Sequence, residues 1–196
     1  MKAAPIVGRF EERFLELPPE VIVATVETNQ RYFTVFKDAA HTQLLNSFIT
    51  ISNIESRDPS QVITGNERVV RPRLTDALFF WEQDRKQPLA AYGEKLASVT
   101  YQKDLGSISD KIGRVRTLAS RIATELTADV TATERAATLA KCDLVTKMVF
   151  EFPELQGLIG GYYAKASGES DAVARAIADG LSIENPGIAD VIKNNG

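Results

Sequence analysis

The two side chains best suited to acid–base or nucleophilic chemistry each occur once in the 196 residues, as His41 and Cys142. A single histidine excludes most histidine-based metal and acid–base sites. His41 lies in a polar turn, where a solvated surface position is expected. Cys142 has no histidine in a matching motif and lies in an apolar stretch with helical spacing. We therefore expect Cys142 to be an inert, buried thiol.

Glycine-rich signatures for phosphate binding are missing from the sequence, which has neither a P-loop nor a GxGxxG pattern. The one glycine-rich string, Gly157–Gly161, falls inside a stretch with helical spacing and does not follow a strand. Its expected role is close helix packing or a bend.

Basic side chains gather in two stretches, and such groups can contact RNA phosphates. The first stretch surrounds Trp81 and consists of Arg68, Arg71, Arg73, Arg85 and Lys86. The second consists of Lys103 and three residues that share a helix face by their spacing, Lys111, Arg114 and Arg121. Four acids interleave with the first stretch and could neutralise it, namely Glu67, Asp76, Glu82 and Asp84. Trp81 follows an apolar stripe, which favours a core position over stacking on a base.

The N-terminal part of the chain predicts mixed structure. Residues 31–37 and 45–52 are rich in aromatic and β-branched residues and predict two strands that pair as a hairpin. Residues 20–29 follow Pro18-Pro19 and fit a short helix, although their composition would equally suit a strand.

From Asp58 onward the spacing is helical. Asp58-Pro59 predicts a helix start, and Leu74, Ala77 and Trp81 recur at helical intervals until Gln87-Pro88. A short helix over about 88–97 follows. The boundary between the two parts should lie between about 87 and 105.

Two capping boxes predict the next helix starts. Ser107 with Asp110 opens a helix with an apolar stripe made of Ile108, Ile112, Val115, Leu118, Ala119, Ile122 and Leu126. Thr131 with Glu134 should open a second, buried helix that continues to Val149. A helix from Pro153 to Ile159 and an amphipathic helix over 170–178, ended by Gly180, complete the predicted elements.

Composition limits the class of protein. The chain is 44% hydrophobic with a net charge of -3, so it can build a sizeable core and is not basic overall. RNA binding would therefore depend on local basic surfaces. The N-terminus carries no apolar secretory run, no stretch approaches the length of a membrane span, and the lone cysteine fits a reducing compartment. We expect a cytoplasmic protein without membrane contact.

Several strings, in this order and spacing, resemble the beta subunit of the bacterial heterotetrameric glycyl-tRNA synthetase. They are residues 66–74 (NERVVRPRL), 77–84 (ALFFWEQD), 105–107 (LGS) with Asp110-Lys111, 140–146 (AKCDLVT), 151–157 (EFPELQG) and 161–164 (GYYA). The resemblance runs from about Gly8 to about Ala178, and residues 179–183 depart from the family pattern.

The resemblance implies an internal fragment of a longer subunit that mainly engages tRNA. The alpha subunit of that enzyme holds the site for ATP and glycine, so this chain should carry no catalytic residue, no metal and no cofactor, although the parent enzyme uses ATP and Mg. The implied partners are the alpha subunit and tRNA(Gly). The implied fold is α+β and mostly α. Residues 1–87 would form a partial mixed α/β module, and residues 88–196 a degenerate HD-like helical domain.

HD-type phosphohydrolases carry a motif similar to His-x-x-Arg-Val on one helix and a His-Asp pair on the next helix. The first string here reads Lys111-Ile112-Gly113-Arg114-Val115, and the second reads Lys141-Cys142-Asp143. Lysine and cysteine replace both histidines, and a lysine ammonium would repel a cation. We therefore expect the fold without the metal chemistry. Asp143 is expected near a helix edge, paired with Lys147 at i+4.

Three functions remain open at this point: positioning of tRNA(Gly) and support of the alpha subunit, a purely structural assembly module without RNA contact, and a retained HD-type metal phosphohydrolase.

Overall fold

A computed structural model describes residues 4–53 and 58–180. These residues fall into two compact units that divide after Glu82. The fold is α+β and mostly α, as the resemblance implies. The predicted departure from the family pattern at residues 181–183 lies outside the described residues.

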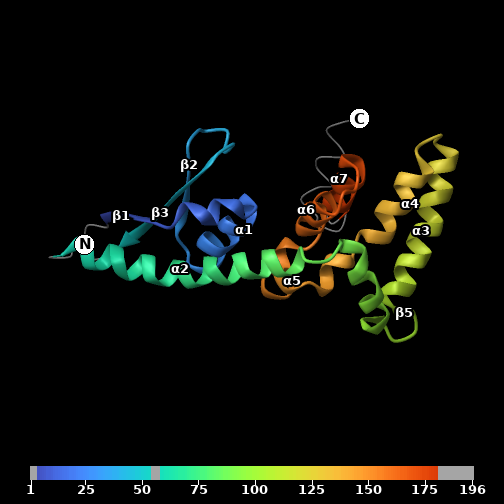
Figure 1. Cartoon of the computed structure of the whole chain (residues 1–196), viewed down its shortest axis with the longest axis horizontal. Helices are drawn as coiled ribbons and strands as arrows, with labels where there is room; N and C mark the ends of the chain where they lie inside the picture. The colour runs from blue at the N-terminus through green and yellow to red at the C-terminus, as the bar shows by residue number, and fades with distance from the viewer. Residues whose placement is uncertain (1–3, 54–57, 181–196) are drawn as a thin grey trace. The chain divides into compact units, whose positions relative to one another are not determined.

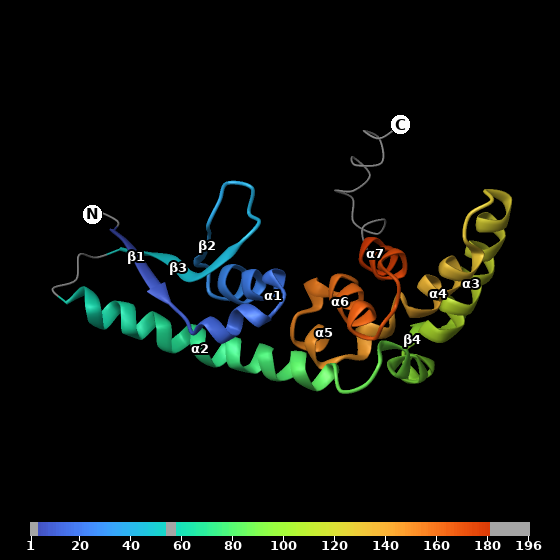
Figure 2. The same cartoon turned by 45° about the horizontal axis from the view of Figure 1, so that its top comes forward.

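The first unit contains a three-stranded antiparallel sheet in the order β1-β3-β2 (Figure 1). The predicted hairpin is confirmed, since β2 (Phe33–Phe36) pairs with β3 (Leu44–Ser52). The strand β1 (Ala4–Arg9) was not expected from the sequence, and it pairs with β3 along its whole length (Figure 2). A long stretch of chain separates the two strands, and short-range spacing carries no information about such a contact.

Short helices pack beside this sheet. A 3₁₀ turn, η1 (Glu12–Glu16), precedes α1 (Pro19–Val23), which continues as the π-helical turn η2 (Ala24–Asn29). Residues 20–29 are therefore helical, and the alternative of a strand is wrong. The fully buried side chains of this unit include Phe14, Val21, Ile22, Val26 and Phe48. They form an apolar core between the helices and the sheet.

The long helix α2 (Pro59–Asp84) begins where the sequence predicts. The Asp58 carboxylate accepts a hydrogen bond from the Ser60 amide at 3.1 Å, and Pro59 occupies the first helical position. Val70, Leu74, Ala77 and Trp81 form its buried stripe. Trp81 is thus a core residue, as its position in the stripe indicates.

The second unit is almost entirely helical. It begins with the 3₁₀ helix η3 (Leu89–Ser98) and a small hairpin of β4 (Thr100–Gln102) and β5 (Gly106–Ser107). The helices are α3 (Ile108–Glu125), α4 (Val130–Leu139), α5 (Lys147–Glu151), α6 (Leu158–Ala166) and α7 (Asp171–Asp179). Short 3₁₀ turns, η4 (Cys142–Val145) and η5 (Pro153–Leu155), join the middle ones. In both views α3 lies beside α4, and α6 beside α7 (Figures 1 and 2).

Of the two capping boxes predicted from the sequence, one is present and the other is not. The Ser107–Asp110 capping box is present at the start of α3, and Ser170 caps α7. The predicted box at Thr131 is wrong, because Asp129 is the N-cap of α4 and accepts a hydrogen bond from the Ala132 amide at 2.9 Å. An aspartate two residues earlier caps the helix, so the helix starts earlier too.

The predicted continuous helix from Thr131 to Val149 is also wrong. The chain leaves the helix after Leu139, forms η4, and starts again at Lys147 with Thr146 as N-cap. Likewise η5 ends at Leu155, and Gly157, with φ of +81°, precedes a new helix. Apolar residues fill both stretches, so hydrophobic spacing alone could not show the breaks.

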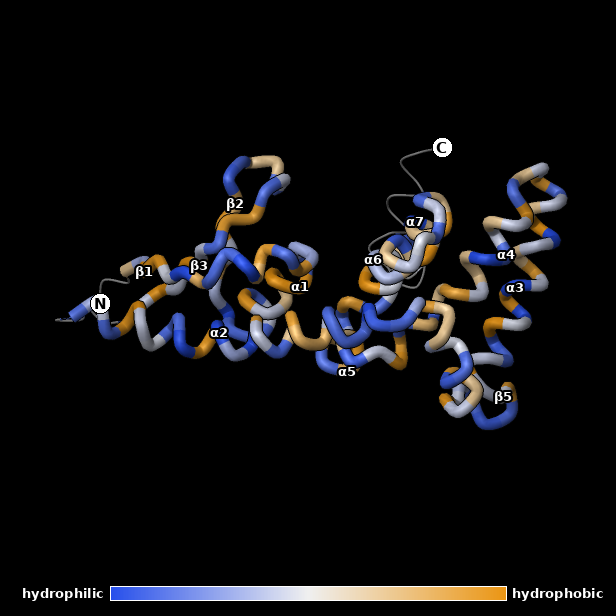
Figure 3. The backbone as a smooth tube through the Cα atoms, in the orientation of Figure 1, coloured by the Kyte–Doolittle hydropathy of each residue, from blue (hydrophilic) through white to orange (hydrophobic). Residues whose placement is uncertain are grey.

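The apolar stripe predicted on α3 is present, but most of it is not covered. Ala123 is buried and Ile112 and Ala119 are half-buried, whereas Val115, Leu118, Ile122 and Leu126 are exposed. Figure 3 shows hydrophobic residues recurring along α3 between hydrophilic ones. Amphipathic spacing indicates which residues share a face, but it does not say whether that face has a partner within the unit.

The helices α6 and α7 approach closely at Gly160 and Gly161, which confirms the packing role expected for this string. A Cβ atom on Gly161 would lie 2.9 Å from the Ala174 carbonyl oxygen and 3.0 Å from the Ala178 Cβ. We expect Gly161→Ala to lower the free energy of unfolding by about 1–3 kcal/mol, because two helix backbones must move apart.

Gly113 provides the matched control, since it also lies within a helix but a Cβ there would meet nothing within 4 Å. Gly113→Ala should raise the free energy of unfolding by about 0.5–1 kcal/mol. Urea denaturation followed by circular dichroism measures both. Equal effects of the two alanines would contradict the packing role of Gly161.

Candidate nucleic-acid interface

The three positions that correspond to HD metal ligands do not form a common site in the second unit. The Lys111 ammonium lies over the Tyr101 ring, 4.6 Å from its centroid. The Cys142 thiol lies 3.7 Å from the Thr138 carbonyl oxygen, and the Asp143 carboxylate is directed to the start of α6. Within residues 4–53 and 58–180, no group of three or more His, Cys, Asp or Glu side chains could hold a metal ion. The described donors therefore do not fit a magnesium or hydrolytic metal site.

Cys142 is the inert thiol that its sequence context predicts. Its side chain is buried, and burial, with a smaller contribution from the neighbouring Asp143 carboxylate, raises its pKa to about 11. The thiolate, which is the reactive form, is therefore scarce at neutral pH.

Asp143 has a different role from the one expected. It is fully buried instead of lying at a helix edge, and its Oδ2 accepts hydrogen bonds from the Gly157 amide and, at 3.1 Å, from the Gly160 amide. The carboxylate thereby caps α6, whose own N-cap residue, Gly157, has no side chain. Burial raises the Asp143 pKa to about 6, against the opposing effect of these amide bonds. Gly160 has no room for a side chain, because a Cβ there would lie 2.9 Å from Asp143 Oδ2.

Asp84 is a second buried carboxylate, and sequence reasoning misplaced it among surface acids that neutralise nearby arginines. It is 3% exposed and accepts hydrogen bonds from the Lys147 amide at 3.1 Å and the Met148 amide at 2.8 Å. The Tyr163 hydroxyl donates at 3.1 Å, and the Tyr92 hydroxyl donates to the Asp84 backbone carbonyl at 3.1 Å. Burial and the Asp84 charge raise the pKa of both tyrosines. Asp84 therefore joins α2, η3, α5 and α6 within the second unit.

The first predicted basic stretch is spread over both units. Arg68, Arg71 and Arg73 lie on the part of α2 that belongs to the first unit, whereas Arg85 and Lys86 belong to the second. Arg71 forms an ion pair with Glu11 at 2.7 Å, and the Lys86 ammonium donates to Gln83 Oε1 at 3.0 Å. Trp81 is buried and is not available for stacking on a base.

The four basic residues of the second predicted stretch do lie in one part of the second unit. Lys103 lies in the β4–β5 hairpin, which leads directly into α3 with Lys111, Arg114 and Arg121. The Arg114 guanidinium donates to the Leu105 carbonyl at 3.1 Å and so fastens the hairpin to the helix. Arg121 pairs with Glu125 at 3.2 Å, and both side chains are largely exposed. We call these four basic residues the α3 basic surface.

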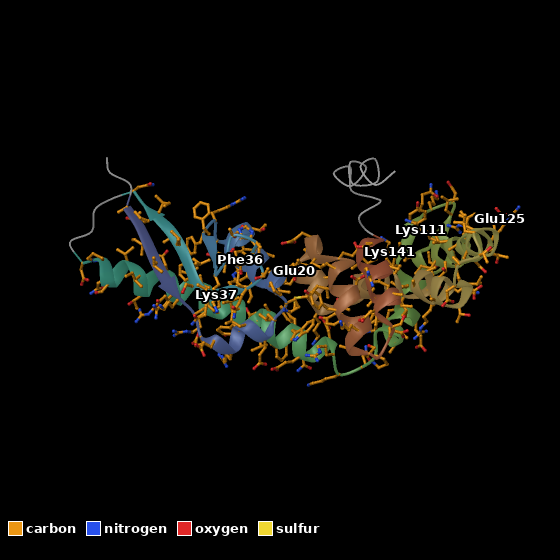
Figure 4. The ribbon with its side chains drawn as sticks, turned by 90° about the horizontal axis from the view of Figure 1, so that it is seen from above. Glu20, Phe36, Lys37, Lys111, Glu125 and Lys141 are labelled. Carbon is orange, nitrogen blue, oxygen red and sulfur yellow. The ribbon has the colours of Figure 1, made fainter. Side chains whose placement is uncertain are left out.

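A groove of about 360 Å³ adjoins this surface between α3, α4 and α7. Its walls include Lys111 and Lys141 and an alanine-rich floor with Ala119, Ala136 and Ala140. Figure 4 shows Lys111 and Lys141 close to one another although they come from different segments. Lys141 was not among the predicted RNA contacts. Its position beside Cys142 and Asp143 in the sequence gave no indication that it would line the same groove as Lys111.

No helix in the described parts of the chain has the length and apolar character that crossing a bilayer requires.

Comparison with known proteins identifies the family to which this chain belongs. The family model described as glycyl-tRNA synthetase beta subunit matches residues 2–187. The glycine–tRNA ligase beta subunit of Pseudomonas savastanoi pv. phaseolicola is 51% identical over 173 residues, which cover 88% of this chain and 25% of that protein. The beta subunit of Chromohalobacter salexigens is 52% identical over 172 residues, with the same coverage. The chain thus spans about a quarter of the length of these relatives, and it belongs to the glycyl-tRNA synthetase beta subunit family.

Proposed function

We propose that this chain helps a glycine–tRNA ligase bind and position tRNA(Gly), and that the α3 basic surface makes the contact. The observation that carries the proposal is the gathering of Lys103, Lys111, Arg114 and Arg121 on one hairpin and helix of a chain whose net charge is -3. A local basic surface on an acidic chain attracts phosphates at a defined place. Lys141, which lines the same groove as Lys111, adds a further positive charge.

The family supplies the reaction in which this contact takes part. The relatives are named as beta subunits of a glycine–tRNA ligase, so the parent enzyme would join glycine to tRNA using ATP and Mg, together with an alpha subunit. In our proposal this chain supplies no catalytic residue. It holds the RNA and supports the catalytic subunit, in the cytoplasm and as an HD-like helical domain joined to a mixed α/β module.

Retained HD-type hydrolysis is not supported by the described residues. The positions Lys111, Cys142 and Asp143 face three different surroundings, and Asp143 is occupied in capping α6. A two-histidine metal centre would need imidazoles that this part of the chain does not supply. An assembly module without RNA contact is the remaining alternative, and binding measurements separate it from our proposal.

The test is binding of labelled tRNA(Gly) across a salt series, with wild-type protein and a Lys111→Ala/Arg114→Ala/Arg121→Ala variant. We expect the variant to bind roughly 10- to 100-fold more weakly at low salt. The slope of log K against log salt should fall by about 0.7–0.9 for each phosphate that the variant no longer neutralises. Fluorescence anisotropy gives both quantities.

A charge-matched variant, Lys147→Ala/Lys165→Ala/Arg175→Ala, removes three exposed positive charges from other helices of the same unit. It should change affinity much less, since it alters net charge without touching the α3 basic surface. Equal weakening by both variants would show non-specific attraction only. No binding by the wild-type protein at low salt would favour the assembly module.

A further inference from the structure

A polar pocket of about 290 Å³ lies within the second unit, beside the buried Asp84 carboxylate. Three exposed lysines line it, and each comes from a different element: Lys86 from the turn after α2, Lys95 from η3 and Lys147 from α5. Asp84 and Tyr92, which are buried, line its inner side. We call this hollow the lysine pocket.

Two of the three ammonium groups are held at the pocket by uncharged partners. The Lys95 ammonium lies over the Tyr92 ring, 5.4 Å from its centroid, and the Lys86 ammonium donates to Gln83 Oε1 at 3.0 Å. A ring and an amide carry no net charge, so neither contact neutralises a cation. Among residues 4–53 and 58–180, no ion pair joins Lys86 or Lys95 to a carboxylate. Both cations are thus available to a bound anion.

Asp84 does not take the place of such an anion. Its carboxylate accepts hydrogen bonds from the Lys147 and Met148 amides and from the Tyr163 hydroxyl, which together offset its charge on the buried side. It is also the one acid among the described residues that line the pocket, so the lysines outnumber it by three to one. A hollow with such a surplus of positive charge attracts anions.

The size and donors of the pocket favour a small phosphate compound. Each ammonium offers three donors to phosphate oxygens, and the amide groups of Gln83 and Gln87 add uncharged donors. A volume of about 290 Å³ is at the lower end of the range for small-molecule sites. A terminal phosphate can enter such a recess, whereas a phosphodiester of RNA carries a sugar on each side.

We propose that the lysine pocket binds a small ligand with a terminal phosphate group, of the class of inorganic pyrophosphate and phosphate monoesters. Lys86 and Lys95 hold the phosphate oxygens, and Lys147 adds a third positive charge. The site is separate from the α3 basic surface, and the proposal does not depend on tRNA binding. Because the pocket shares Asp84 with α2, η3, α5 and α6, its ligand should also stabilise the folded second unit.

The test titrates the chain with inorganic pyrophosphate at constant ionic strength and follows backbone amides by ¹H–¹⁵N NMR. In the wild type we expect saturable shifts at the amides of Lys86, Lys95 and Lys147. The Lys86→Ala/Lys95→Ala variant should bind roughly 10- to 100-fold more weakly, because it lacks two charged hydrogen-bond donors. Pyrophosphate should raise the melting temperature of the wild type more than that of the variant.

The matched control is Lys165→Ala/Arg175→Ala, which removes the same number of positive charges from α6 and α7 of the same unit. It should bind pyrophosphate as the wild type does. Urea denaturation without ligand checks that Lys86→Ala/Lys95→Ala leaves the fold intact, since both side chains are exposed.

Three results would overturn the proposal. The first is a wild-type titration with no saturable shift at millimolar pyrophosphate. The second is equal weakening by the test and control variants, which would show general attraction of an anion to a positive surface. The third is weaker tRNA(Gly) binding by Lys86→Ala/Lys95→Ala with unchanged pyrophosphate binding, which would assign these lysines to RNA. Loss of tRNA binding in the α3 variant alone bears only on the proposed function.

Discussion

Replacing Asp84 by alanine should lower the free energy of unfolding by about 3–5 kcal/mol, because it removes the acceptor for several buried donors. The Met148 amide and the Tyr163 hydroxyl are buried and both donate to Asp84 Oδ2, at 2.8 and 3.1 Å. The Lys147 amide donates to Oδ1 at 3.1 Å. The Asp84 side chain is itself buried, at 3% exposed. Urea denaturation followed by circular dichroism measures the decrease.

Two further variants identify the cause. Tyr163→Phe removes one hydroxyl and should cost about 0.5–1.5 kcal/mol. Glu82→Ala alters an exposed acid two residues earlier on α2 and should change stability by less than about 0.5 kcal/mol. If Asp84→Ala behaved like Glu82→Ala, Asp84 would be a surface acid, as its place among the arginines suggests, and the buried network would be refuted.

The second large effect is expected at Asp143. Asp143→Ala leaves the Gly157 and Gly160 amides without an acceptor at the buried start of α6, and should cost about 2–4 kcal/mol. Asp143→Asn keeps an acceptor oxygen for both amides. It should cost much less than the alanine substitution at neutral pH. Equal destabilisation by the two variants would show that the packing of the side chain, and not its hydrogen bonding, matters.

The pH dependence of stability supplies a second readout for Asp143. Its pKa is raised from 3.8 to about 6, mainly by burial, so the folded state binds a proton more tightly than the unfolded state does. The stability from this group is present below about pH 4 and is lost as the pH rises to about 6. The free energy of unfolding of the wild type should therefore fall, relative to that of Asp143→Asn, by up to about 3 kcal/mol across this window.

The comparison with Asp143→Asn is needed because other acids act in the opposite direction. Hydrogen bonds lower the pKa of Asp38, Asp58 and Asp110, so the stability that these groups contribute declines as the pH falls. They are unchanged in the variant and cancel in the difference. A difference that stays constant from about pH 4 to about pH 7 would contradict the burial of an ionisable Asp143.

Helix starts and the hairpin were predictable wherever a short-range signal decides them. Asp58 before Pro59, Ser107 with Asp110, and Ser170 lie next to the amides that they cap. The aromatic and β-branched residues of β2 and β3 indicate strands without reference to distant segments. The family strings, from residues 66–74 to 161–164, likewise depend only on order and spacing, and the family match over residues 2–187 confirms them.

Contacts between distant residues had no such signal. The pairing of β1 with β3, the capping of α6 by Asp143 and the hydrogen bonds from Lys147, Met148 and Tyr163 to the Asp84 carboxylate join residues that lie from 14 to 79 positions apart. Its neighbours in the sequence suggest that Asp143 is a surface acid beside Lys147, and only the packing of α6 and α7 shows that it is buried.

For the candidate site, too, local spacing predicts some features and tertiary packing decides the others. Periodicity places Lys111, Arg114 and Arg121 on one helix and shows that α3 is amphipathic, because a helix repeats every 3.6 residues. It does not show that Lys141 and Lys111 line the same groove, or that four residues of the apolar stripe are exposed. Both facts depend on where α4 and α7 lie against α3, and that placement is decided by side-chain packing between elements far apart in the chain.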